Sequence, residues 1–262
     1  MIPNGGPAAR QFGRLAAPAV LTELSTESVL CLPIGSHEQH GPHLPLNTDT
    51  VIAEQFTRLL IERYGEQHDL WALPTIPYGL SLEHAWSPGT VSLRTVGFLA
   101  LLEALVTEYL RATPARRLLI VNGHGGNRGI LEPALYELER RHAFSVCIIH
   151  PTSLSPVPTV GGTVPEVHAG IRETAMMLEL APDDVHLDRL PADFTTSGSN
   201  VQRLVMERGT TWPWTSDDSR IATCGVIGGD PREATAEAGR AVLDGALDAA
   251  GPVLAHLTDR RQ

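Results

Sequence analysis

Apolar residues along the chain alternate between short continuous runs and longer stretches with helical spacing. The continuous runs are typical of strands buried on both faces, and they predict strands over 28–34, 71–76, 118–121 and 146–149. The helical spacing predicts helices over 50–63, 96–111, 130–138 and 171–180, and an alanine-rich helix over 231–257 that is interrupted near Gly251 and Pro252. Pro33 predicts a bulge or an end in the first strand, because proline lacks the N–H that a central strand donates.

Strands that alternate with helices indicate an α/β fold, with a mainly parallel sheet and helices on both faces. In such sheets ligands bind beyond the carboxyl ends of the strands. The 262 residues suit one large domain, which we assign to 1–262. Within it, 151–167 holds four prolines and two glycines without periodicity, which predicts a long surface loop of the kind that often forms a lid or a binding loop.

Thirty acidic against twenty basic side chains give a formal charge of −10. This balance works against a nucleic-acid or anionic-membrane surface, so the expected partner is a small molecule or a short peptide. No stretch approaches the roughly 20 apolar residues that span a bilayer, and no basic and apolar leader opens the chain, so we expect a cytoplasmic protein. The three cysteines lack C-x-x-C spacing, which supports neither a disulfide framework nor a thiolate zinc site.

Candidate chemistry concentrates first in GSHEQHGPHLPLNTD, residues 35–49, which follows the first predicted strand. In an extended segment Glu38 and His40 point to the same side, so they can address two neighbouring metal ions. Asp49, at the start of the next helix, can bridge them, and mixed nitrogen and oxygen ligands suit zinc, manganese or iron. The alternative is that His37, His40 and His43 satisfy loop backbone groups and that Glu38 is a solvated charge.

Two further segments carry candidate ligands. His124 lies in VNGHGGN directly after a predicted strand, where a metal ligand is favoured over phosphate binding because no phosphate-binding glycine motif is present. The alternative is a tight turn in which the histidine is incidental. HAGIRET places His168 at the end of the proline-rich loop and Glu173 in the first turn of a helix. Glu173 can bind metal, or it can simply be a carboxylate stabilised at a helix start.

The four segments GSHEQHGPHLPLNTD, VNGHGGN, HAGIRET and GVIGGDPREATAEAGR closely resemble, in order, the motif blocks of the creatininase family of metal-dependent amidohydrolases. The resemblance extends from about residue 18 to residue 245. It implies a three-layer α/β/α sandwich, a binuclear divalent metal centre and a homo-oligomer, commonly a hexamer. Two ions per subunit are expected, with zinc first and manganese or iron as alternatives.

The resemblance also implies roles for individual residues. Glu38 and His124 would hold one metal, His40 would hold the other, and Asp49 would bridge them. His168 matches the histidine that transfers a proton. Creatininase has a further carboxylate two positions after its equivalent of His124. This chain has Gly126 there, so we take Glu173 as the substitute ligand and, with His168, as a catalytic residue.

The implied activity is hydrolysis of an amide C–N bond in a small cyclic or linear amide by metal-activated water. Ile171 after HAG, and the absence of clear counterparts of the tryptophans that close over creatinine, argue against creatinine itself. The alternatives are a mycofactocin-type peptidase that cleaves a modified peptide terminus, and a non-catalytic binding protein. Candidate substrate contacts are His84, Trp86, Trp212 and Trp214, although His84 can instead make a structural hydrogen bond and the tryptophans can lie at a rim or a subunit contact.

Overall fold

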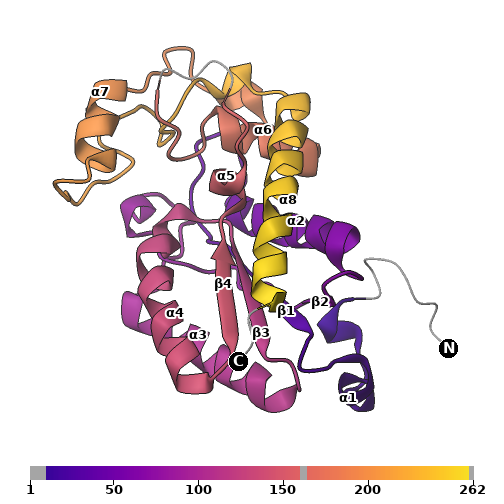
Figure 1. The fold of residues 1–262 in the computed structure, drawn as a ribbon. Helices are drawn as coiled ribbons and strands as arrows, with labels where there is room; N and C mark the ends of the chain where they lie inside the picture. Colours follow the sequence, from indigo (N-terminus) through magenta and orange to yellow (C-terminus); the bar gives the residue numbers. More distant parts are fainter. Residues whose placement is uncertain (1–9, 160–163, 260–262) are drawn as a thin grey trace.

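A computed structural model describes residues 10–159 and 164–259. The strands and longer helices follow one another in the order β1 (Val29–Ile34), α2 (Thr48–Tyr64), β2 (Leu70–Ala72), α3 (Thr95–Ala112), β3 (Arg117–Asn122), α4 (Arg128–His142), β4 (Ser145–Ile149), α6 (Ile171–Leu180) and α8 (Ala236–Asp259). Short helices are α1 (Val20–Glu23), α5 (Pro151–Leu154) and α7 (Gly198–Asn200), the last of which lies on an arm that projects from the body (Figure 1).

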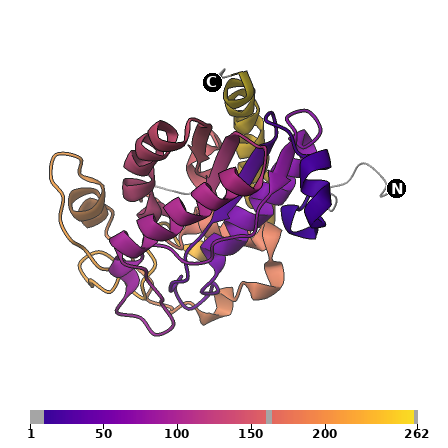
Figure 2. The same ribbon diagram turned by 90° about the horizontal axis from the view of Figure 1, so that it is seen from below.

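The four strands form one parallel sheet in the order β2-β1-β3-β4. Successive side chains of the central strands point to opposite faces. Val29, Cys31, Leu119 and Val121 pack with apolar residues of α2 and α8, whereas their neighbours along β1 and β3 pack with α3 and α4. Figures 1 and 2 show the sheet between these two helical layers. The arrangement confirms the predicted three-layer α/β/α sandwich.

Pro33 does not interrupt β1, contrary to the expected bulge or end. The strand continues to Ile34, and Pro33 pairs in register with Val121 of β3. The carbonyl of Pro33 accepts a hydrogen bond from Ile76 on the β2 side. A strand residue points its N–H and C=O toward the same neighbour, so the missing N–H of Pro33 faces a position beyond the end of β2, where no ladder bond is lost.

Two other expectations about regular structure are corrected. The strand expected over 71–76 is only Leu70–Ala72, because Pro74 cannot continue its ladder. The helix expected over 231–257 begins later, at Ala236, and runs uninterrupted through Pro252 to Asp259. Buried residues on both sides of Pro252 hold α8 against the core, and this packing outweighs the hydrogen bond lost inside the helix.

The segment expected as one long loop, 151–167, begins with α5, and residues 160–163 lie outside the described part of the chain. The side chain of Arg172 makes several contacts with its described part. The guanidinium of Arg172 donates hydrogen bonds to the backbone carbonyls of Thr152, Ser155 and Val157 at 2.7–3.1 Å. The loop is therefore anchored to the start of α6.

Two glycines bring the first turn of α2 against the ends of the central strands. A Cβ at Gly35, after β1, would meet backbone atoms of Thr50, and one at Gly123, after β3, would clash with the carbonyl oxygen of Asp49. Only glycine permits this approach of helix and strand ends. As a result, Asp49 lies over the carboxyl edge of the sheet.

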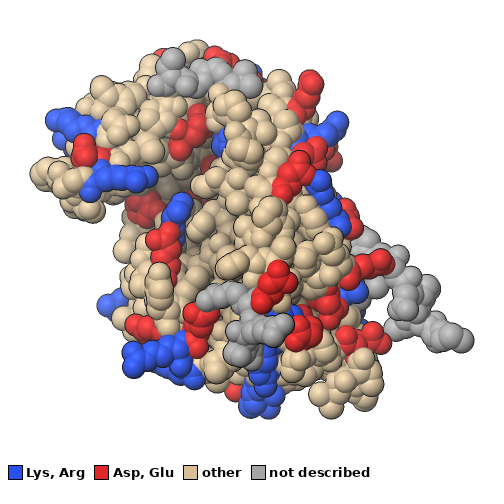
Figure 3. Space-filling view, in the orientation of Figure 1, with Lys and Arg blue, Asp and Glu red and all other residues tan. Residues whose placement is uncertain are grey.

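The surface carries mixed charge on the face that Figure 3 shows, where acidic and basic side chains are interspersed. A recess lies on this face between the arm that carries α7 and the body of the molecule. Among the residues that the structure describes, none of the helices has the length and hydropathy required to cross a bilayer.

Candidate metal centre

The segment that follows β1 enters the protein interior and carries charged side chains with it. Glu38, His40 and Asp49 are each at most 1% exposed. Ser81 donates a hydrogen bond to Oε2 of Glu38. The loop after β3 adds His124, and the segment before α6 adds His168, both at most 5% exposed. The carboxyl edge of the sheet thus gathers five buried side chains that the sequence separates widely.

The three histidines share one hydrogen-bonding pattern. His40 donates Nδ1–H to the carbonyl of Glu38 at 3.1 Å, whereas His124 and His168 each donate Nε2–H at 2.7 Å, to the carbonyls of Leu80 and Gln39. These contacts turn the other ring nitrogen of each histidine toward the carboxylates. A backbone carbonyl behind each imidazole is the usual arrangement around metal-ligating histidines.

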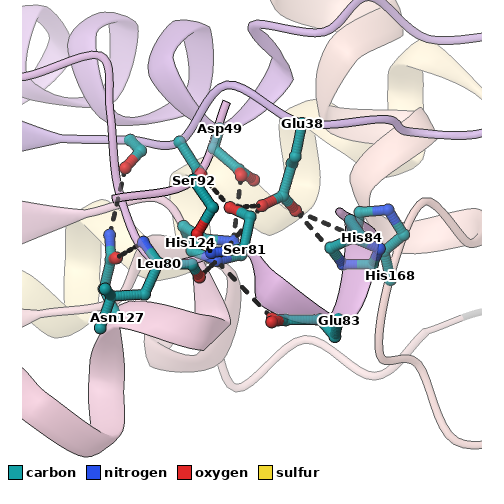
Figure 4. A network of polar contacts seen from close by, with 12 residues as sticks. Glu38, Asp49, Leu80, Ser81, Glu83, His84, Ser92, His124, Asn127 and His168 are labelled. Atoms are coloured by element: carbon teal, nitrogen blue, oxygen red, sulfur yellow. Dashed lines mark hydrogen bonds and ion pairs between the residues drawn. The ribbon is translucent and has the colours of Figure 1, made fainter. Parts of the chain in front are cut away.

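Asp49 lies between two of these imidazoles, with one oxygen near each. Oδ1 is 3.2 Å from Nε2 of His40, and Oδ2 is 3.1 Å from Nδ1 of His124. Glu38 also lies between two imidazoles. Its Oε2 is 3.3 Å from Nε2 of His124, the nitrogen that also contacts Leu80, and its Oε1 is 3.5 Å from Nδ1 of His168 (Figure 4). Yet Oδ2 of Asp49 and Oε1 of Glu38 have no hydrogen-bond partner, although both atoms are buried.

The ligand atoms group into two overlapping sets. Glu38, Asp49 and His124 form the first, and Glu38, His40 and His168 form the second, with the ligand atoms of each set within 4.8 Å of one another. Buried carboxylate oxygens without a hydrogen bond are costly unless a cation compensates them. The donor set and the two orphan oxygens therefore fit divalent metal ions.

The electrostatics of the cluster follow from burial and from its own charges. Burial raises the pKa of Glu38 to about 7, against the opposing effect of His124. Burial would also raise the pKa of Asp49, but His40 and His124 hold it well below its usual range. Burial would lower the pKa of His40, but Asp49 and Glu38 outweigh it and raise this pKa to about 9. The carboxylates of this site thus attract positive charge strongly.

His168 differs from the other two histidines. Burial, with the neighbouring His84 and His40, keeps its pKa well below the ordinary value. The imidazole is therefore neutral near pH 7, with a bare Nδ1. That is the form which can bind a metal or accept a proton.

Glu173 lies on the first turn of α6 and is outside both ligand sets. Its Oε2 accepts a hydrogen bond from Ala169 N–H at 2.6 Å. Burial raises its pKa to about 7, partly offset by His40, and its charge in turn acts on His40. The residue thus stabilises the loop backbone at the helix start while it remains in electrostatic reach of the cluster.

Gly126, where creatininase has a carboxylate, has no room for a side chain. A Cβ there would collide with Nε2 of His124 and would lie 2.5 Å from the carbonyl oxygen of Leu80 and 2.7 Å from Oε1 of Glu83. Glu83 itself lies 3.9 Å from Nε2 of His124. The departure from the resemblance at this position is therefore accommodated by the packing around it.

The candidate substrate residues fall into two groups. His84 is buried, with Nε2 3.5 Å from Oε1 of Glu38 and its ring stacked on that of His168. Trp86 donates a hydrogen bond to Ser216, which lies beside His84. The ring of Trp214 packs edge-on against the ring of His84, with centroids 6.2 Å apart. Trp212 is 54% exposed, and within the described chain neither a hydrogen bond nor a ring contact joins it to the cluster.

Two other histidines of the first motif lie outside the ligand sets. The ring of His37 lies 5.9 Å from that of Tyr78, and Nε2 of His43 is 2.9 Å from the hydroxyl of Thr174. Conversely, the motifs did not single out Gln39 or Ser216, which contact His84 and are buried. Gln39 could have been found as the residue between two ligands, whereas the surroundings of Ser216 in the sequence carry no signal.

The family is identified by comparison with known proteins. A model of the creatininase family, described as creatinine amidohydrolase, matches residues 14–253. The chain belongs to the creatininase family. The mycofactocin precursor peptide peptidase of Mycolicibacterium smegmatis is 37% identical, over 82% of this chain and 79% of that protein. The creatinine amidohydrolase of Pseudomonas putida is 32% identical, over 64% of this chain and 72% of that protein.

Solved creatininase structures have the same fold. A mutant creatininase complexed with creatine has a TM-score of 0.78 and 24% identity, covering 95% of this chain and 99% of that chain. A manganese creatininase has a TM-score of 0.74 and 24% identity, over 96% and 99% of the respective chains. Together with the family match and the buried cluster, these findings confirm the creatininase fold and a metal-dependent amidohydrolase.

Proposed function

We propose that this creatininase-family protein hydrolyses the C–N bond of an amide at two divalent metal ions. The observation that carries the proposal is the pair of overlapping ligand sets, which share the buried carboxylate of Glu38. One ion would be held by Glu38, Asp49 and His124. The other would be held by His40 and Asp49, with Glu173 and the second oxygen of Glu38 in reach. Ions of this kind supply a Lewis acid that lowers the pKa of water from 15.7 to about 7.

The side chains of this chain provide the remaining functions. Asp49 has one oxygen toward His40 and one toward His124, which supports a bridging role. His168 has its Nε2–H engaged by the carbonyl of Gln39. Its bare Nδ1 can therefore take a proton from the attacking water and pass it to the departing nitrogen. Such proton transfer contributes about 10² to 10⁴ in rate.

The substrate is a small cyclic or linear amide, or the end of a modified peptide. The peptide is favoured by one specific observation, since the mycofactocin precursor peptide peptidases are 35–37% identical to this chain over 82–86% of its length. Trp86 and Trp214 lie beside His84 and are the aromatic residues that we assign to the substrate pocket. Trp212 would contact only a longer substrate, because it is exposed and apart from the cluster.

Two measurements on the full chain test the proposal. Metal analysis after reconstitution with Zn²⁺, and separately with Mn²⁺ and Fe²⁺, is expected to give two equivalents per subunit, with zinc held most tightly. Turnover is then measured across lactams, formamides and short peptides with modified termini. Less than one equivalent of any of these metals, or no hydrolysis of any amide by the loaded protein, would contradict the proposal. The relative rates with small amides and with peptides assign the substrate class.

Oligomeric state and location are the remaining parts of the proposal. We expect a homo-oligomer, and a hexamer by resemblance to the family, which light scattering of the purified chain would measure. The cytoplasm is the expected location.

A further inference from the structure

His84 is held on one side by groups that determine which of its nitrogens carries hydrogen. Nδ1 lies 2.7 Å from the hydroxyl of Ser216 and 3.0 Å from Nε2 of Gln39. The amide of Gln39 is oriented by Gly41, whose N–H donates to Oε1 at 2.8 Å, so Nε2 of Gln39 is a donor. Nε2 of Gln39 also lies 3.1 Å from the carbonyl of Gly225, from the hydroxyl of Ser216 and from Nε2 of His168, so one of its two hydrogens serves Gly225 and the other can serve Nδ1 of His84. We take Nδ1 of His84 as the acceptor, which places the hydrogen of this neutral imidazole on Nε2.

Ser216 continues this arrangement on the side away from the metal cluster. It is fully buried, and its own N–H donates to the carbonyl of Glu83 at 2.9 Å. Its hydroxyl oxygen accepts the indole N–H of Trp86 at 2.8 Å. The hydroxyl hydrogen lies between Nδ1 of His84 at 2.7 Å and the carbonyl of Glu83 at 3.4 Å, and the shorter contact assigns it to His84. Trp86, Ser216 and His84 form a chain in which every hydrogen bond points toward the metal cluster.

The Nε2–H at the end of this chain faces the place where the two ligand sets meet. It lies 3.5 Å from Oε1 of Glu38, an atom without a hydrogen-bond partner, and Figure 4 shows His84 and His168 approaching Glu38 side by side. The two rings are stacked with centroids 3.9 Å apart. They differ in what they present inward, because His168 offers a bare nitrogen and His84 offers an N–H.

We propose that Ser216 holds His84 as a fixed N–H donor, and that this donor hydrogen-bonds the carbonyl oxygen of the substrate amide as negative charge develops on it. This inference rests on the hydrolysis proposed above. Ser216 is a positioning residue, and His84 forms and breaks no covalent bond in this role. A donor that is already oriented in a water-poor site stabilises such charge without reorganisation.

The tautomer provides a test that does not depend on turnover. Histidine-¹⁵N-labelled full chain, loaded with Zn²⁺, is examined by long-range ¹⁵N–¹H correlation, and the signals of His84 are identified by their loss in His84→Gln. We expect the Nε2–H tautomer of a neutral imidazole. A hydrogen on Nδ1, or an Nε2 shifted by bound zinc, would overturn the proposal.

Two matched variants test the role in the reaction. The amide nitrogen of glutamine can occupy the place of Nε2, whereas that of asparagine reaches only to the place of Nδ1. We expect His84→Asn to lower kcat about 10² to 10³-fold, as removal of one oxyanion donor does. His84→Gln should retain kcat to within about tenfold, and both variants should change KM by less than about threefold. Equal losses of kcat in the two variants would overturn the role of the N–H.

Further controls separate this inference from the hydrolysis itself. Ser216→Ala should lower kcat about tenfold with KM retained. Ser87→Ala, at a half-buried position whose hydroxyl bonds to the carbonyl of Pro88, should leave kcat unchanged. Zinc content is expected to stay at the wild-type value in every variant, and its loss in the His84 variants would make His84 a metal ligand instead. If the wild type hydrolyses none of the amides, the hydrolysis proposal itself fails, whatever the tautomer of His84.

Discussion

The two ligand sets of the metal centre are built in different ways. Glu38, Asp49 and His124 belong to segments at the ends of β1 and β3 and to the start of α2, where Gly35 and Gly123 allow backbone to contact backbone. His168 of the second set follows the proline-rich segment, whose position depends on side-chain hydrogen bonds. The first set is thus supported by backbone packing at the strand ends, whereas His168 is supported by hydrogen bonds between loops, including backbone pairing with Ile227.

Glu166 and Arg172 supply the side-chain part of this support. Glu166 accepts hydrogen bonds from the backbone N–H groups of Arg172 and Gly229, and so joins the segment of His168 to a distant loop. Arg172 anchors the preceding loop. Polar contacts of partly exposed groups contribute less stability each than apolar burial, so we expect the second set to be the more easily disturbed.

The largest effect is expected from Glu38, the residue that both sets share. Glu38→Gln removes one negative charge from each set, and kcat/KM should fall about 10⁴-fold, which corresponds to about 5.5 kcal/mol. Metal analysis of the same variant should show less than one equivalent per subunit. Retention of two equivalents would show that the sets do not depend on this carboxylate.

His124 and His168 distinguish the two sets. His124→Ala should lose metal, because its Nδ1 has Asp49 as neighbour in the first set. His168→Ala should keep its metal and lose about 10³ in kcat, the effect of removing a proton-transfer group. Equilibrium dialysis against zinc, combined with steady-state kinetics, measures both quantities. Loss of one equivalent in His168→Ala would mean that this residue binds metal rather than transferring a proton.

A smaller effect is expected from the packing around His124. In Gly126→Ala the new methyl group collides with the imidazole and displaces it, so zinc affinity should fall about 10- to 100-fold, as for other changes just outside the ligands. Gly125→Ala is the matched control, since a Cβ there meets no atom within 4 Å. Equal zinc affinities in the two variants would contradict the steric argument.

The smallest effect concerns how stability depends on pH through His150, which lies next to the Asn122 side chain that supports the loop of His124. Asn122 donates a hydrogen bond to the carbonyl of His124 at 2.6 Å and lies 3.0 Å from Nδ1 of His150. Burial, with a contribution from Arg128, lowers the pKa of His150 from 6.5 to about 4. Between pH 6.5 and pH 4, His150 is therefore protonated in the unfolded chain and neutral in the folded chain. As the pH falls through this range, His150 lowers the free energy of unfolding.

His150→Gln removes that proton uptake. Between about pH 7 and pH 4.5, chelator-treated variant should lose about 1–2 kcal/mol less free energy of unfolding than the wild type, after allowance for partial exposure. Urea unfolding at the two pH values gives the difference. Parallel losses in the two proteins would exclude His150 as a source of acid sensitivity.

The sequence predicts a structural feature well when the interactions that produce that feature are local in the chain. The helix α6 has the predicted bounds, 171–180, because its apolar spacing and its glycine start are local signals. The candidate ligands Glu38, His40, Asp49 and His124 come together as their motifs imply. The early end of β2, by contrast, and the unbroken course of α8 depend on how proline is placed against its tertiary neighbours.

The same distinction applies inside the site. Ser216 and Gln39 act on His84 through contacts between segments far apart in the chain, for which no spacing rule exists. The place of Trp212 could not be predicted either, because an aromatic residue in a loop suits a pocket and an exposed surface equally well. Motifs predict which side chains carry chemistry, and tertiary contacts decide how each one is oriented.

The wide separation of the ligands along the chain has a consequence for biosynthesis. When a ribosome has released only the segment around Glu38, His40 and Asp49, the nascent chain offers zinc a flexible, incomplete set of donors. His124 and the later His168 join it only after β3 and the segment before α6 have also been synthesised and the parallel strands have paired. We therefore expect metal binding to follow folding, so that the newly made apoprotein folds before it competes for the cellular metal supply.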